Sequence, residues 1–144
     1  MRNTHTMEKE YVQLKEKEVE YRLSATRKDF NRAKITKSKD AADYARQFYF
    51  DDMMIYESVF IIMTNRANNT IGYAKISQGG IAGTVVDIRL ILKYAIDNLA
   101  SGIILVHNHP SGNMIASPQD IQISKKLKEA ARVMDIFLLD SIII

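Results

Sequence analysis

The chain of 144 residues contains no cysteine. This absence excludes disulfide bonds, a thiol nucleophile and thiolate metal sites, so any metal site must use nitrogen and oxygen ligands. The sequence also lacks an apolar run close to the roughly 18–20 residues of a membrane span. Its polar N-terminus shows no signal peptide. We therefore expect a cytoplasmic protein that makes no membrane contact.

The composition is ordinary, with 47% hydrophobic and 26% charged residues, as is typical of one soluble globular domain of this length. The net charge of +3 is unevenly distributed: residues 1–47 carry 12 basic and 8 acidic side chains, and the remaining residues carry 8 and 9. A basic segment can mark a nucleic-acid partner. A lysine-rich segment of mixed sign is also typical of a solvated surface, so both interpretations stay open.

Residues 1–34 are interpreted as a charged N-terminal extension, part helix and part strand. Residues 8–17 have a helix-forming composition, and residues 18–25 alternate polar and apolar side chains, which predicts a strand with one buried face. Residues 26–37 are basic and irregular, as expected of a linker.

From residue 35 onward, periodic and apolar segments alternate along the chain. Helical spacing predicts three helices, over residues 38–50, from 84 or 87 to 99, and over 117–133. Apolar runs predict four strands, over residues 58–64, 71–77, 103–109 and 136–144. The order predicts an α/β (α+β) domain over residues 35–144, in which helices flank a mixed central β-sheet. Because the last strand ends on bare isoleucines, we expect a chain cut at its C-terminus.

The helical stripes also predict which side chains face the core. The second helix should bury Ile91, Ala95 and Leu99, and the third should bury Leu127, Ala130 and Met134. The chain has only three histidines, and two of them follow the buried strand that begins near residue 103.

If extended backbone continues to His109, the side chains of His107 and His109 share one face, about 7 Å apart at Cβ. Asn108 then lies on the opposite face, and we interpret it as structural. Pro110 ends the strand, because proline has no N–H for a central ladder. The two imidazoles can therefore converge on a single cation.

The next helix begins at Ser117, with Pro118 at its first position, and its first turn delivers Asp120. Two histidines and one carboxylate form the ligand set of open hydrolytic zinc sites. A plainer interpretation is a capping box, in which Ser117 and Asp120 satisfy the first N–H groups of the helix. The residues alone fit both interpretations.

The spacing His-x-His, seven residues, Ser, two residues, Asp is the metal motif of the JAMM/MPN+ metallopeptidases. Together with residues 77–80, 84–87, 107–112 and 138–140, it resembles the RadC-like JAB domain, from about residue 35 to the end. The resemblance implies the JAB/MPN architecture, which is related to the cytidine-deaminase fold.

The resemblance also implies a role for each motif residue. His107, His109 and Asp120 would bind Zn²⁺ and leave one position for water. The glutamate that the family pattern places upstream matches Glu57, which would act as general base and then protonate the leaving amine. Ser117 would donate a hydrogen bond to the oxyanion of the tetrahedral intermediate.

These features predict a zinc-dependent metallopeptidase or isopeptidase-type hydrolase with a peptide or protein substrate. The alternative is a binding protein of DNA repair or of mobile elements, with DNA or a protein as partner and a vestigial or regulatory metal site; the basic first third of the chain supports it. A metal-dependent nuclease suits a single zinc less well. One departure is Ser141, where the family pattern has histidine, and we interpret it as the loss of a secondary contact.

Overall fold

The computed structural model describes residues 24–29, 31–49, 51–79 and 85–144, together with Glu18, Glu20 and Arg22. In chain order, the elements found in these residues are α2 (Ser38–Ala45), the 3-10 helix η1 (Asp51–Met54), β1 (Ser58–Thr64), β2 (Thr70–Gln78), α3 (Ile88–Asp97), β3 (Gly102–His107), α4 (Pro118–Val133) and β4 (Phe137–Ile143).

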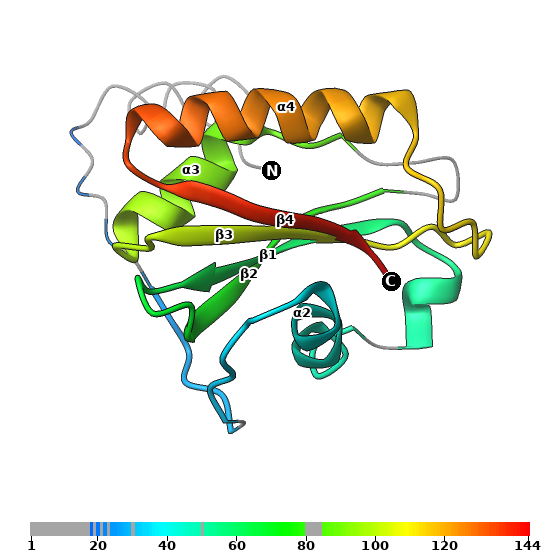
Figure 1. The fold of residues 1–144 in the computed structure, drawn as a ribbon, viewed down its shortest axis with the longest axis horizontal. Helices are drawn as coiled ribbons and strands as arrows, with labels where there is room; N and C mark the ends of the chain where they lie inside the picture. The colour runs from blue at the N-terminus through cyan, green and yellow to red at the C-terminus, as the bar shows by residue number, and fades with distance from the viewer. Residues whose placement is uncertain are drawn as a thin grey trace, which may run out of the picture.

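The four strands form one mixed sheet in the order β2-β1-β3-β4. β1 pairs antiparallel with both β2 and β3, whereas β3 and β4 run parallel. Helices α3 and α4 cover one face of the sheet and α2 covers the other (Figure 1). The predicted α+β fold, a mixed central sheet flanked by helices, is confirmed.

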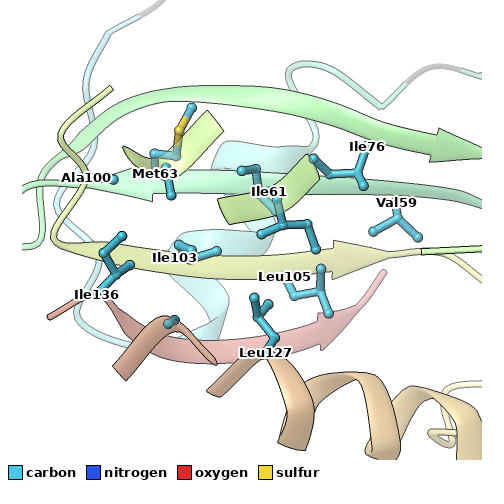
Figure 2. Packing of buried hydrophobic residues seen from close by; sticks show 12 residues of the cluster. Val59, Ile61, Met63, Ile76, Ala100, Ile103, Leu105, Leu127 and Ile136 are labelled. Atoms are coloured by element: carbon cyan, nitrogen blue, oxygen red, sulfur yellow. The ribbon is translucent and has the colours of Figure 1, made fainter. Parts of the chain in front are cut away.

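The two central strands are apolar on both faces, because each face has its own core. Successive residues of a strand point to opposite faces, so Val59 and Ile61 pack toward α3 and α4, whereas Phe60 packs toward α2. Figure 2 shows the first core, in which Leu127 of α4 is fully buried among side chains of β1 and β3. On the other face, Phe48 stacks on Tyr73 with ring centroids 4.0 Å apart.

The end of the sheet where β3 begins is tightly packed. A Cβ atom on Gly102 would meet Thr64 Oγ1 and would lie 2.7 Å from Leu139 Cδ1. Glycine is required here because β1 and β4 approach the β3 backbone from both sides.

The helix ends differ from their predicted positions. α2 ends at Ala45 rather than near residue 50, although Phe48 and Tyr49 are still buried. α3 ends at Asp97, and Leu99 is 87% exposed with φ of +53°. The prediction that Leu99 faces the core is wrong, because the chain leaves the helix before the apolar stripe reaches this residue.

Other predictions also need correction. Met134 lies beyond α4 and is exposed, and Ala131 rather than Ala130 is fully buried. The strand predicted over residues 18–25 is absent from its described residues, which are exposed. The helix predicted over residues 8–17 lies outside the described residues. No helix among the described residues combines the length and apolar character that crossing a bilayer requires.

Candidate metal centre

A cavity of about 550 Å³ opens at the C-terminal end of β3. Its polar lining comes from three places: the segment before β1, the end of β3 with the loop that follows, and the first turn of α4. The polar lining residues include Glu57, His107, His109, Ser117 and Asp120. The structure therefore brings all five sequence-predicted site residues to one cavity.

His107 is the last residue of β3 and pairs with Val59 of β1. Its side chain lies on the same face of the sheet as Ile103 and Leu105, the face covered by α3 and α4, and it lines the cavity next to this core. The residue is only 5% exposed. Burial disfavours the imidazolium form and lowers the pKa of His107, and the neighbouring His109 acts in the same direction.

His109 lies beyond the strand, because β3 ends at His107 and not at residue 109 as predicted. The two imidazole rings are nevertheless close, with centroids 4.9 Å apart. His109 Nδ1 lies 2.7 Å from the carbonyl oxygen of Asn113. Since a carbonyl only accepts, Nδ1 carries the proton in this bond, and in the neutral ring the lone pair is on Nε2.

The capping box at the start of α4 is present. Ser117 Oγ accepts from the backbone N of Asp120 at 3.1 Å, and Asp120 Oδ2 accepts from the backbone N of Ser117 at 2.7 Å. Burial raises the pKa of the Asp120 carboxyl, but the bonds with Ser117 and the two histidines outweigh burial, so the pKa of Asp120 is lowered. Asp120 therefore caps the helix and also faces the imidazoles.

The same Oδ2 atom of Asp120 lies 3.2 Å from His109 Nε2 and 3.4 Å from His107 Nε2. The potential ligand atoms of these three residues, here named the ligand cluster, all lie within 4.8 Å of one another. His107 Nε2 is buried and has no hydrogen-bond partner in the part of the chain that the structure describes. A cation accepting the lone pairs of the cluster would satisfy this nitrogen, so His107, His109 and Asp120 could hold a metal ion.

Glu57 lies between η1 and β1 and lines the cavity beside the ligand cluster. Its Oε1 is 3.8 Å from His109 Nε2, which is too long for a direct hydrogen bond. Its backbone carbonyl accepts from Gly79 N at 2.8 Å. Glu57 thus reaches the cavity without being tied to the histidines.

Sequence reasoning missed the contacts of Asn108 and the apolar wall of the cavity. Asn108 does point away from the histidines, but its side chain bonds to the backbone on both sides of Glu57. No periodicity reveals this, since the partners are some 50 residues apart. The apolar lining comes from Met54, Ile55, Val59, Val86, Leu105, Pro110 and Ile123. Gln78 and Gly79, the last described residues before residue 85, do not line the cavity.

Two polar residues of β4, Asp140 and Ser141, form side-chain hydrogen bonds to the helices on either side of the sheet. Asp140 accepts from Ser38 Oγ at 2.5 Å and thereby joins β4 to α2. Ser141, the departure from the family pattern, forms a hydrogen bond with Ser124 of α4, Oγ to Oγ at 3.1 Å. Ser141 does not line the cavity.

Comparison with known proteins agrees with this arrangement. Residues 35–144 match the family described as the RadC-like JAB domain. The chain is similar to a UPF0758 protein of Flavobacterium johnsoniae, 43% identical over 111 residues, which are 77% of this chain and 48% of the relative. A UPF0758 protein of Porphyromonas gingivalis is 37% identical over 113 residues, which are 78% of this chain and 49% of the relative.

The chain spans about half the length of these curated relatives. The mixed sheet with its three α-helices is consistent with a JAB/MPN domain, and the two histidines and the aspartate fall within the matched region. The chain belongs to the family of RadC-like JAB domains.

Proposed function

We propose that the domain is a zinc-dependent hydrolase that cleaves amide or isopeptide bonds in a peptide or protein substrate. One observation carries the proposal: Glu57, Ser117 and the ligand cluster line a single cavity, although Glu57 is distant from the others in sequence. A JAB domain with this set of side chains suits metal-assisted hydrolysis better than simple binding.

His107 Nε2, His109 Nε2 and one oxygen of Asp120 would hold the ion. A bound zinc ion supplies a Lewis acid that polarises a carbonyl and lowers the pKa of water to about 7. With three protein ligands, a bound zinc ion would keep one coordination position for water or substrate, as catalytic zinc sites require. Because the chain has no cysteine, its metal ligands must be nitrogen and oxygen atoms, and the ligand cluster supplies both.

The remaining polar residues have separate tasks. Glu57, free of a direct bond to the histidines, accepts a proton from the attacking water and passes it to the leaving amine. Ser117 Oγ already accepts from Asp120 N, so its hydroxyl proton is available to donate to an oxyanion in the cavity.

The lining of the cavity favours a neutral substrate. Among the described residues that line it, there is neither lysine nor arginine, the side chains that usually bind phosphate or a free carboxylate. This disfavours a nuclease and an exopeptidase that reads a C-terminal carboxylate. The DNA-binding alternative relied on the basic charge of residues 1–47, none of whose described residues lines the cavity.

Metal analysis of the purified protein tests the proposal first. We expect about one zinc per chain after reconstitution, and loss of this zinc in His109→Ala. Glu57→Gln is the matched variant, since it should keep zinc and lose turnover of a quenched peptide library. Zinc that fails to bind, or binding that is unchanged in His109→Ala, would refute the metal site; equal turnover by Glu57→Gln would refute the assigned base.

A further inference from the structure

We infer that Asn108 is a positioning residue: it holds the segment of residues 53–58, here named the Glu57 segment, against the end of β3. The inference rests on the proposed function, because it concerns where Glu57 stands relative to the ligand cluster. Asn108 lies between the two histidines in sequence, and its side chain points to the opposite side of the chain.

The hydrogen bonds of Asn108 meet the backbone on both sides of Glu57. Asn108 Oδ1 accepts from Ser58 N at 2.8 Å, and Nδ2 donates to the carbonyl of Tyr56 at 2.8 Å. Nδ2 also donates to the carbonyl of Met53 at the end of η1. The residue is 1% exposed, so the oxygen and the nitrogen of its side-chain amide depend on these partners and not on water.

Between Met53, which packs against the core on the α2 side, and Ser58 of β1, few other contacts hold the Glu57 segment. Met54, Ile55 and Tyr56 are exposed, so they contribute little packing. The Glu57 side chain has no hydrogen bond among the described residues, and its backbone carbonyl bonds only to Gly79 at the end of β2. The position of the carboxylate is therefore determined mainly by Asn108 and by the start of β1.

Tyr49 strengthens the connection between the start of β1 and the end of β3. The buried Tyr49 hydroxyl lies 2.7 Å from the carbonyl of Ser58 and 3.2 Å from the carbonyl of Val106. The Tyr49 hydroxyl thus links the first residue of β1 to β3. Asn108, which lies between the two histidines in sequence, links the end of β3 to the segment before β1. Glu57 and the imidazoles are therefore anchored to adjacent backbone, which fixes their relative positions.

Asn108→Ala in the full chain tests the inference, with Asn98→Ala as the matched control. Asn98 Nδ2 also donates to a backbone carbonyl, that of Tyr94 at 2.8 Å, but it caps α3 away from the cavity. Co²⁺ is added to ¹⁵N-labelled protein, and pseudocontact shifts report the place of each amide relative to the ion. We expect Asn108→Ala to move or broaden the amides of residues 54–58 and Asn98→Ala to leave them unchanged.

The amide of Ser58 gives a readout that needs no metal. In the chelator-treated protein its exchange with solvent should accelerate about tenfold or more in Asn108→Ala, because its acceptor is gone. Asn108→Leu serves if the alanine variant does not fold: it keeps the branched shape of the asparagine side chain but removes both the Oδ1 acceptor and the Nδ2 donor. In that variant we expect displaced amides at residues 54–57 and faster exchange at Ser58, as in Asn108→Ala.

The outcomes separate the two proposals. If Co²⁺ and Zn²⁺ do not bind, the proposed function fails, whereas Ser58 exchange still tests the contacts of Asn108. If the ions bind and the amides of residues 54–58 keep their shifts in Asn108→Ala, positioning by Asn108 is refuted. Where turnover is measured, Asn108→Ala should lower kcat with zinc content unchanged and should add nothing to Glu57→Gln, since both act through one carboxylate.

Discussion

His109 Nδ1 donates to the carbonyl oxygen of Asn113 across a 2.7 Å contact, and this bond turns the Nε2 lone pair toward Asp120 Oδ2, 3.2 Å away. In the neutral ring, both atoms of the second pair are acceptors. Two acceptors at this distance repel unless a proton or a cation lies between them. The turn that carries Asn113 therefore orients His109 so that its Nε2 could bind a metal ion.

Gly112 allows this turn, because its φ is +78° and its N–H donates to the carbonyl of His109 at 2.9 Å. Valine is strained in this conformation, whereas asparagine adopts it readily. We expect Gly112→Val to weaken zinc binding about 10–100-fold, the usual effect of disturbing a residue that orients a ligand. Gly112→Asn should stay near the wild-type value. Competition with a chromophoric chelator measures both, and equal affinities would contradict the prediction.

Ser117→Ala should destabilise the metal-free protein by about 1 kcal/mol, because the first turn of α4 loses the acceptor for Asp120 N. Ser117→Thr keeps a hydroxyl at the cap and should lose much less. Urea unfolding in the presence of a chelator measures the free energy of unfolding. A Ser117→Ala variant as stable as Ser117→Thr would show that the capping bond contributes nothing.

Gly102→Ala should cost roughly 1–3 kcal/mol, the usual effect of overpacking, because the new methyl group meets Thr64 and Leu139. Gly72→Ala in β2 is the control, since its only near neighbour is Met63 Cε at 4.0 Å. That change should alter stability by less than about 0.5 kcal/mol. Thermal unfolding of both variants gives the comparison, and a similar Tm for the two would contradict the close approach of β1 and β4 at Gly102.

The Asp40 carboxylate lies in the first turn of α2 and accepts from Thr36 Oγ1 at 2.6 Å and from Thr36 N at 2.8 Å, and these hydrogen bonds lower the pKa of Asp40. Since the folded pKa is the lower one, the stabilisation is fully present above the unfolded pKa, about 3.9, and is lost as pH falls through the folded value. We therefore expect Asp40→Asn to lower Tm at pH 6 and to match the wild type near pH 2. A pH-independent difference in Tm would contradict this.

The sequence predicts those elements of the fold that depend on neighbouring residues better than those that depend on distant contacts or on turns. β1 was predicted over its full length, since residues 58–64 form a nearly uninterrupted apolar run that only a strand buried on both faces explains. The ends of α2 and α3 were missed because Phe48 and Leu99 continue the apolar stripe after the backbone has left the helix. The spacing of apolar residues shows which side chains could be buried, but it does not show where a turn ends the helix.

The site divides in the same way. The capping box of Ser117 and Asp120 is a local feature that short sequence spacing reveals. The close approach at Gly102 and the bonds of Asn108 depend on partners that only the sheet pairing brings near. Glu57 was identified through the family pattern alone, since a single glutamate before a strand carries no signal of its own.

The ligand cluster comes from one continuous strand, loop and helix, whereas Glu57 joins it only through the pairing of β1 with β3. Closing the short loop costs less chain entropy than bringing together Ser58 and Asn108, which are 50 residues apart. During folding, the ligand cluster can therefore assemble before Glu57 reaches it. Under the proposed function, an incompletely folded chain would bind zinc but would not catalyse hydrolysis. Activity would appear only after β1 pairs with β3 and brings Glu57 to the ligand cluster.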